Sequence, residues 1–144
     1  MNQDAPSFVL VEPDEDDRYL MREAIRQTGS DYSVIELASG ADLISYLQRE
    51  LHEKGSQKVL WLIILDFNMP AMSGLDVLKT MQQNELWKQV PVIILTANED
   101  PAIKDQVLAA GASAYVAKPF SVEELADQMR TTFAPWIQNP VSLQ

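Results

Sequence analysis

The sequence predicts an α/β fold, a three-layer (βα)5 sandwich in which five parallel strands form one sheet between two layers of helices. Five short apolar runs recur along the 144 residues, and segments in which apolar residues repeat with helical period separate them. The connections are short, and parallel strands need a right-handed crossover that contains a helix. The alternation therefore favours a mostly parallel sheet covered by helices on both faces.

The five apolar runs are the predicted strands. They span residues 8–11, 32–37, 60–65, 92–95 and 114–117. The third consists of six consecutive apolar residues, which predicts a strand buried on both faces. The second is more polar than the others, so we expect it at an edge of the sheet.

The predicted helices follow from apolar residues spaced three and four positions apart. Three such faces are Leu20, Met21, Ala24, Ile25 and Thr28; Leu43, Ile44, Leu47 and Leu51; and Val122, Leu125, Ala126, Met129 and Phe133. A short helix is expected between residues 73 and 85, and another after Pro101. Each helix thus presents one apolar face to the sheet.

Residues that commonly cap helices agree with these boundaries. Gly29 and Gly111 lie where a helix C-terminus favours glycine. Pro101 follows an aspartate as a first-turn proline follows an N-cap, and Ser121 with Glu124 matches the capping box. The order of strand and helix is therefore supported by both periodicity and local chemistry.

Composition limits the classes of function. Hydrophobic residues make up 47% of the chain, which suits one globular domain, and the formal net charge is −10 at pH 7. Negative charge opposes contact with phosphate backbones, so nucleic-acid binding is not expected. The sequence has no cysteine, no leader pattern and no apolar run near the roughly 18 residues of a membrane span. We expect a cytoplasmic protein that binds neither nucleic acid nor membrane.

Polar side chains follow the predicted strands at their carboxyl ends. These ends meet at one rim of a parallel sheet, where α/β proteins bind ligands. The residues expected there are Glu12 and Asp14 after the first strand, Asp66 and Asn68 after the third, Thr96 after the fourth and Lys118 after the fifth. Asp66 is therefore predicted to be a nucleophile surrounded by carboxylates, a hydroxyl and an ammonium group.

The arrangement resembles the receiver domain of two-component response regulators. The features that carry the resemblance are the acidic first loop, Asp66-x-x-x-Pro70, Thr96-Ala97 and Lys118-Pro119, in this order and spacing. The resemblance covers about residues 7–134 and implies a flavodoxin-like parallel sheet of order 2-1-3-4-5. We expect residues 1–144 to form a single receiver domain, with a core of 7–134 and a C-terminal tail of 135–144.

The resemblance implies a signalling protein that receives a phosphoryl group from a sensor histidine kinase. Asp66 would be the phosphoacceptor, and Thr96 and Lys118 would bind the phosphoryl oxygens. The cofactor would be Mg²⁺, with Glu12, Asp14, Asp66 and the backbone carbonyl of Asn68 as ligands. Such a protein assists its own phosphorylation and dephosphorylation but is not an enzyme in the usual sense.

The resemblance also implies a conformational switch. Thr96 would move toward the phosphoryl group while the ring of Tyr115 turns inward, which changes the face built from the fourth helix, fifth strand and fifth helix. Homodimerisation through that face is common in the family. The peptide bond between Lys118 and Pro119 would be cis. The chain is further similar to single-domain receivers that partner bacterial phytochrome kinases.

One position departs from the receiver pattern. Pro13 stands where a metal-binding aspartate is expected, and proline offers no side-chain ligand. Glu12 can still reach a metal ion, and Asp14 could substitute if the loop turns differently. The departure leaves a second interpretation open, a pseudo-receiver that serves as a protein-interaction module with weakened metal binding and no phosphorylation.

Two further classes of protein fit less well. Aspartyl-phosphate hydrolases usually carry an acid two residues after the nucleophile, where this chain has Asn68. A flavin carrier needs a phosphate-binding loop of glycine, serine or threonine after the first strand, and none is present. The amide side chains of Asn68 and Asn98 cannot act as general bases, which predicts an ordinary rate of self-dephosphorylation and not a very fast one.

Several remaining residues have simpler interpretations. Asp16 and Asp17 are expected to be solvated residues at a helix start, where the macrodipole favours negative charge. Trp87 is expected to be a packing residue. The apolar tail, which contains Trp136, is expected to cover a neighbouring subunit or the flank of its own domain.

Overall fold

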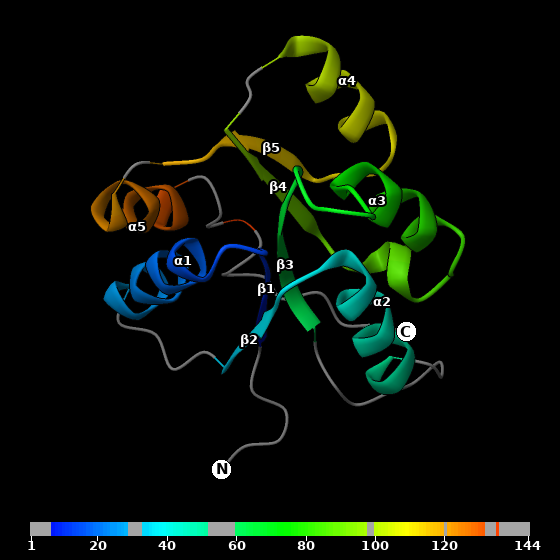
Figure 1. The fold of residues 1–144 in the computed structure, drawn as a ribbon, viewed down its shortest axis with the longest axis horizontal. Helices are drawn as coiled ribbons and strands as arrows, with labels where there is room; N and C mark the ends of the chain where they lie inside the picture. Colours follow the sequence, from blue (N-terminus) through cyan, green and yellow to red (C-terminus); the bar gives the residue numbers. More distant parts are fainter. Residues whose placement is uncertain are drawn as a thin grey trace.

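The computed structural model describes residues 7–28, 33–51, 60–97, 100–119, 121–131 and 135. Five strands form one parallel sheet in the order β2-β1-β3-β4-β5 (Figure 1). The strands are β1 (Ser7–Val11), β2 (Ser33–Leu37), β3 (Leu60–Asp66), β4 (Val92–Thr96) and β5 (Ala114–Ala117). The predicted fold class and strand order are confirmed.

Helices cover both faces of the sheet. They are α1 (Glu15–Gln27), α2 (Gly40–Glu50), α3 (Gly74–Gln82), α4 (Pro101–Ala109) and α5 (Val122–Thr131), with a 3₁₀ turn, η1 (Trp87–Gln89), before β4. Figure 1 shows α1 and α5 side by side on one face and α2, α3 and α4 on the other. None of the helices in the described residues has the length and apolar character that a membrane span needs.

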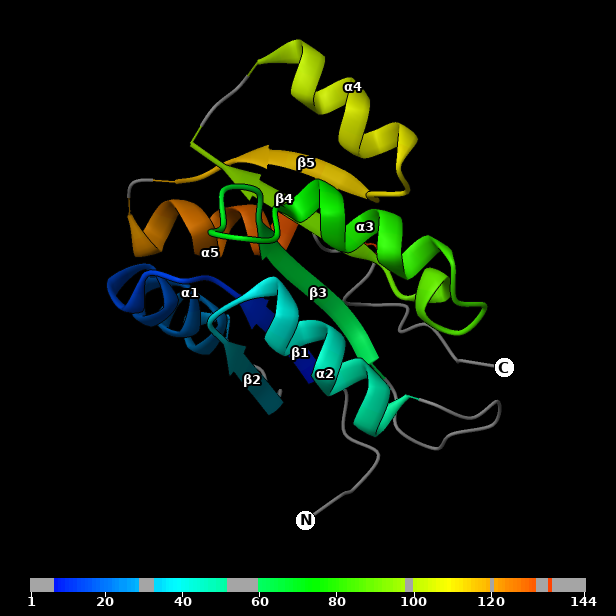
Figure 2. The same cartoon turned by 45° about the vertical axis from the view of Figure 1, so that its right-hand side comes forward.

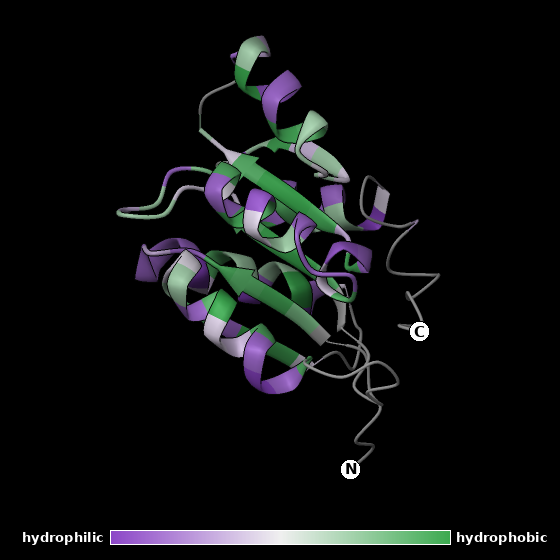
Figure 3. Cartoon of the chain, turned by 90° about the vertical axis from the view of Figure 1, so that its right-hand side faces the viewer, coloured by the Kyte–Doolittle hydropathy of each residue, from purple (hydrophilic) through white to green (hydrophobic). Residues whose placement is uncertain are grey.

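The sheet separates two apolar clusters, as a three-layer sandwich requires. Successive strand residues face opposite sides. Phe8 and Leu10 of β1 pack with Met21 of α1 and Leu125 of α5, whereas Val9 packs with residues of α2, α3 and α4. Figure 3 shows strands that are hydrophobic along their length and helices that carry hydrophilic residues as well. The strand and helix periodicities seen in the sequence therefore correspond to the faces that pack in the two apolar clusters.

The strands at the two edges are less buried than those in the middle. All five residues of β4 are buried, whereas those of β2 and β5 are mostly half-buried. β2 pairs with β1 only, so the edge position predicted from its polar residues is confirmed.

Capping side chains define where several helices begin and end. Ser39, Ser73 and Asp100 accept hydrogen bonds at the starts of α2, α3 and α4. Gly111 follows α4 with φ of +110°, and a Cβ there would lie 2.2 Å from Nε2 of Gln82. The positive φ favours glycine at this turn, whereas the flexible end of the Gln82 side chain can move aside for a Cβ. Gly29 lies outside the described residues.

Trp87 is a packing residue, as predicted. Its side chain is buried, and its indole Nε1 donates a hydrogen bond to the carbonyl of Leu51 at 2.8 Å. Leu51 ends α2 and Trp87 lies in η1, just before β4. The bond therefore joins two connections at the amino end of the sheet, opposite the rim where the polar residues were predicted.

One local expectation, the cis peptide bond, is wrong, and several others concern residues outside the described part of the chain. The peptide bond between Lys118 and Pro119 is trans, since the described residues contain no cis bond. The trans isomer is the one that X-Pro bonds favour by about 0.5–1 kcal/mol. Phe133, Trp136 and Asn98 lie outside the described residues, as does almost all of the predicted tail.

Candidate functional site

Side chains from three strand ends converge on one side of the carboxyl rim. The residues two positions before Glu12, Asp66 and Lys118 all belong to the apolar cluster under α1 and α5. Strand alternation therefore turns these three side chains toward the same face. Glu12 and Asp66 are almost fully buried, with 1% and 6% of their surface exposed.

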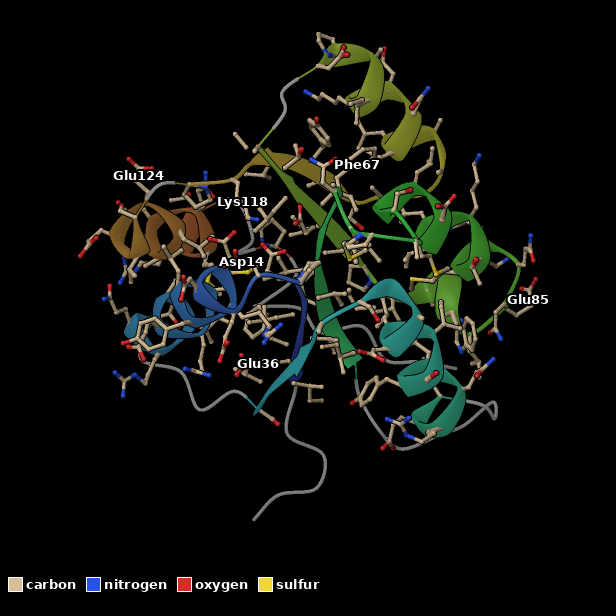
Figure 4. The ribbon with its side chains drawn as sticks, viewed as in Figure 1. Asp14, Glu36, Phe67, Glu85, Lys118 and Glu124 are labelled. Carbon is tan, nitrogen blue, oxygen red and sulfur yellow. The ribbon has the colours of Figure 1, made fainter. Side chains whose placement is uncertain are left out.

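The ammonium group of Lys118 lies among three carboxylates. Its Nζ is 2.8 Å from Oδ2 of Asp17 and 3.4 Å from Oδ2 of Asp66, and it donates a hydrogen bond to Oε1 of Glu12. The backbone N–H of Lys118 donates to the carbonyl of Thr96 at 2.7 Å, which fixes the residue just beyond β5. Figure 4 shows Lys118 at this position, between β5 and α5.

The electrostatics of the cluster reflect burial and mutual pairing. Burial raises the pKa of Glu12 to about 8, and the neighbouring Asp66 carboxyl adds to the increase while Lys118 opposes it. Burial lowers the pKa of Lys118, but hydrogen bonds to Asp17 and Glu12 and the charge of Asp66 outweigh it, so the pKa is raised overall. The hydrogen bond from Lys118 lowers the pKa of Asp17. Lys118 therefore stays charged, and Glu12 holds its proton more tightly than an exposed glutamate.

The donor set of this cluster suits a hard cation. Carboxylate oxygens are the ligands that Mg²⁺ prefers, and Oε2 of Glu12 is buried without a hydrogen-bond partner. In the part of the chain that the structure describes, no three acidic or histidine side chains are already spaced to hold a metal ion. The ammonium of Lys118 lies among the carboxylates instead.

The structure does not bring Asp14 to the cluster. Its Oδ1 accepts a hydrogen bond from the backbone N–H of Asp17 at 2.9 Å, so Asp14 is the N-cap of α1 and is exposed. The extended backbone of an N-cap residue turns the side chain toward the first turn of its own helix. Figure 4 shows Asp14 at the start of α1. Its predicted role as a metal ligand has no geometric support.

Asn68 and Pro13 lie close to the cluster in the chain, but their side chains add nothing to it. The backbone N–H of Asn68 donates to Oδ1 of Asp66 at 3.3 Å, and the Asn68 side chain is exposed. Pro13 is half-buried and offers only its carbonyl. Asn68 therefore orients the Asp66 carboxylate through its backbone.

Asp17 is a site residue that the sequence interpretation missed. It was expected to be solvated, yet its carboxylate pairs with Lys118 and its side chain is 43% exposed. Helical periodicity could have predicted this position, because Asp17 lies four residues before Met21 and seven before Ala24, both of which face the sheet. Asp17 therefore belongs to the inner face of α1.

Arg18 holds the loop that carries Glu12. Its Nη1 donates to the carbonyl of Glu12 at 2.8 Å and reaches the carbonyl of Pro13 at 3.5 Å. Its Nε lies 3.8 Å from Oε1 of Glu36 in β2. Arg18 was also missed, because nothing in sequence spacing reports a side chain that folds back onto its own preceding loop.

Thr96 and Tyr115 share the opposite face of the sheet. Thr96 is fully buried and follows Ile94 by two positions, and Tyr115 pairs with Ile94 in the register of β4 and β5. The Tyr115 ring is half-buried against the cluster under α2, α3 and α4. The two switch residues predicted from the sequence are therefore neighbours on one face.

Comparison with known proteins gives a consistent result. The family description "response regulator receiver domain" matches residues 8–130. The polar-differentiation response regulator DivK of Brucella ovis is 30% identical over 125 residues, which cover 87% of this chain and 94% of DivK.

Two solved structures show the same architecture. The Mn²⁺-bound form of response regulator Rcp1 superposes with a TM-score of 0.77 at 25% identity, over 96% of this chain and 98% of Rcp1. The phosphorylated cyanobacterial phytochrome response regulator RcpA gives a TM-score of 0.80 at 22% identity, over 96% of this chain and 98% of RcpA, and shows likeness of fold.

Proposed function

This chain belongs to the response regulator receiver family, and on that premise we propose that it accepts a phosphoryl group on Asp66 from a sensor histidine kinase. Receivers are signalling modules of two-component systems and are not generally classed as enzymes. The proposed reaction transfers a phosphoryl group to a carboxylate, and the residues of the protein position the acceptor and neutralise charge.

The pairing of Asp66 with Lys118 carries the proposal. Oδ2 of Asp66 lies 3.4 Å from the Lys118 ammonium, and only 6% of the Asp66 surface is exposed. A buried carboxylate with a fixed cation beside it can take up a phosphoryl group whose oxygens that cation then stabilises. Attack by the Asp66 carboxylate on phosphorus would form an acyl phosphate and release the donor, either the kinase histidine or a small-molecule carboxylate.

Mg²⁺ is the proposed cofactor. Glu12, Asp66 and the backbone carbonyl of Asn68 would hold it, and it would neutralise charge on the phosphoryl oxygens. The partnerless Oε2 of Glu12 supports a cation at this place.

The proposed signal is a movement on the opposite face of the sheet. Thr96 would hydrogen-bond the phosphoryl group and Tyr115 would follow it inward, altering the surface of α4, β5 and α5. Their shared face and adjoining positions in β4 and β5 support such coupling. Homodimerisation through that surface, cytoplasmic location and the division into a 7–134 core and a tail remain predictions.

The identity of the kinase is a narrower part of the proposal. A bacterial phytochrome kinase is the partner expected from the resemblance to single-domain receivers. The phytochrome response regulator RcpA shares the fold at 22% identity, and this supports a common architecture.

Intact mass spectrometry tests the proposal directly. Incubation with acetyl phosphate and Mg²⁺ should add one phosphoryl mass to the wild-type chain. Asp66→Asn should abolish the addition, and Asp105→Asn, which changes an exposed carboxylate of α4, should leave it unchanged. No added mass on the wild-type chain, or equal addition to Asp66→Asn, would contradict the proposal.

A second candidate function has one observation in its favour. Pro13 removes a carboxylate, and the Lys118 ammonium lies among the carboxylates that remain. A pseudo-receiver that keeps this closed cluster would bind partners without phosphorylation. In that case the same experiment would give no added mass even at high Mg²⁺ concentration, while the folded chain would still bind its partner.

A further inference from the structure

Lys118 can serve Asp66 only if its long side chain is held in one conformation. The ammonium group of a lysine is a compact charge at the end of a flexible stem, and ordering that stem costs conformational entropy. The backbone N–H of Lys118 donates to the carbonyl of Thr96 at 2.7 Å, which fixes the residue but not the end of its side chain. The position of the ammonium therefore depends on the groups that contact it.

Three carboxylates contact the ammonium nitrogen, which matches the three N–H bonds that an ammonium can donate. Oε1 of Glu12 accepts a hydrogen bond from Nζ, and Oδ2 of Asp17 lies 2.8 Å from it. Oδ2 of Asp66 lies farther away, at 3.4 Å. The contact with Asp66 is thus longer than the contact with Asp17, and the two carboxylates on the β1 and α1 side hold the ammonium more closely.

Asp17 brings its carboxylate from a well-anchored element. It lies in the first turn of α1, the helix that buries Met21 and Ala24 against the sheet. The capping role at this helix start belongs to Asp14, which accepts a hydrogen bond from the backbone N–H of Asp17. The Asp17 side chain is therefore free of that role and pairs with Lys118. Groups on packed helices are held more precisely than groups on loops.

We propose that Asp17 is a positioning residue, whose carboxylate holds the Lys118 ammonium beside Asp66 before a phosphoryl group arrives. The N–H that faces Asp66 can then turn to a phosphoryl oxygen while Asp17 keeps another N–H of the same ammonium. A donor that is ordered in advance stabilises new charge without being reorganised during the reaction. This inference rests on the proposed function, because it concerns the cation that assists phosphoryl transfer to Asp66.

The neighbouring Asp16 provides a matched control for charge. Successive helix residues differ by about 100° in direction, so Asp16 points away from the face that Asp17 presents to the sheet. The structure agrees, because Asp16 is exposed and Asp17 is half-buried against Lys118. Both aspartates lie in the first turn of α1, where negative charge interacts favourably with the helix dipole. Replacing either one by asparagine changes the net charge equally.

Nuclear magnetic resonance of the lysine ammonium groups tests the positioning without any phosphoryl donor. An ammonium that is held and shielded exchanges its protons slowly and gives a proton–nitrogen correlation signal, and the Lys118 side chain is only 20% exposed. Loss of the signal in Lys118→Ala identifies it. The signal should persist in Asp16→Asn and should broaden or disappear in Asp17→Asn. A signal that is unchanged in Asp17→Asn, or missing from the wild-type chain, would overturn the inference.

The rate of phosphorylation by acetyl phosphate and Mg²⁺ tests the consequence. Asp17→Asn should slow the gain of mass on the order of tenfold, because a small displacement of an assisting group is costly to a transfer reaction. Asp16→Asn should change the rate by less than about twofold, as expected for a screened surface charge. When Lys118→Ala is already present, adding Asp17→Asn should change the rate by less than about twofold, since residues that act through one another are not additive.

The outcomes separate this inference from the proposed function. Equal slowing by Asp17→Asn with and without Lys118 would overturn the inference, because Asp17 would then act independently of the lysine. Faster phosphorylation of Asp17→Asn would also overturn it and would show that Asp17 withholds Lys118 from Asp66. Absence of any added mass on the wild-type chain would refute the proposed function, whereas the ammonium signal would still report whether Asp17 positions Lys118.

Discussion

The two helices that flank the carboxyl rim, α1 and α4, are held to the protein very differently. α1 buries Met21, Ala24 and Ile25 and packs along α5, and its Arg18 bonds the loop before it. Of the nine residues of α4, all of which the structure describes, only Val107 is buried. Figure 2 shows α4 lying beyond β5, at the edge of the molecule.

This difference gives the site one side next to a firmly packed helix and one side next to a weakly packed helix. The charged cluster of Glu12, Asp17, Asp66 and Lys118 lies on the well-packed α1 side, whereas Thr96 and Tyr115 face the side to which α4 is attached. Few buried contacts mean that a segment opens at low free-energy cost. The arrangement suits a protein in which chemistry needs fixed groups and the response needs a helix that can shift.

The largest expected effect tests the anchoring of α1. Met21→Ala removes a side chain that is 2% exposed, and such a loss in a packed core costs about 3 kcal/mol of unfolding free energy. Leu108→Ala in α4, where the leucine is 39% exposed, should cost less than about 0.5 kcal/mol. Urea denaturation measures both. Similar losses from the two substitutions would contradict the difference between the helices.

The next effect tests the charged side of the site. Lys118→Ala removes the cation that pairs with Asp66, so phosphorylation by acetyl phosphate should slow on the order of 100-fold, as when one stabilising donor is lost from a transition state. Lys104→Ala in α4 removes an exposed positive charge and serves as the control. The initial rate of mass gain measures both. A comparable slowing in the control would assign the effect to net charge.

A smaller effect concerns the turn that attaches α4 to β5. Gly111→Ala places a Cβ against Gln82 on a backbone with φ of +110°, and it should cost about 2 kcal/mol of unfolding free energy. The nearby exposed Ser113→Ala should cost less than about 0.5 kcal/mol. Thermal and urea unfolding report the difference. An unchanged midpoint for Gly111→Ala would mean that this end of α4 adjusts freely.

The smallest effect tests the Arg18 contact. Arg18→Ala removes the donor to the carbonyl of Glu12, and it should cost about 1 kcal/mol of unfolding free energy. Arg26→Ala, which breaks only an exposed pair with Glu23, should cost less than about 0.5 kcal/mol. If the two losses are equal in urea denaturation, Arg18 does not hold the loop.

Most of the fold was predictable because several independent sequence signals, namely apolar runs, their polarity and helix-capping residues, indicate the same elements. The six-residue apolar run before Asp66 predicted a central strand, and the polar second run predicted an edge strand. Asp100 with Pro101 and Gly111 marked the two ends of α4. Each of these signals is local, and the parallel order follows once the alternation of strand and helix is known.

The site was only partly predictable because side-chain direction near a helix start depends on packing. Glu12, Asp66 and Lys118 were placed correctly, since strand ends fix where such residues emerge. Asp14 caps α1 and lies outside the cluster, whereas Asp17, which was expected to be solvated, faces inward and pairs with Lys118.

The buried indole of Trp87 has a practical consequence. It lies at the amino end of the sheet and bonds Leu51, whereas Asp66 lies at the carboxyl end. In a variant that retains Trp87 as its sole tryptophan, the tryptophan fluorescence should change when the whole fold is lost. It should stay constant during reactions at Asp66. The fluorescence would therefore distinguish a variant that has unfolded from one that has lost only its chemistry.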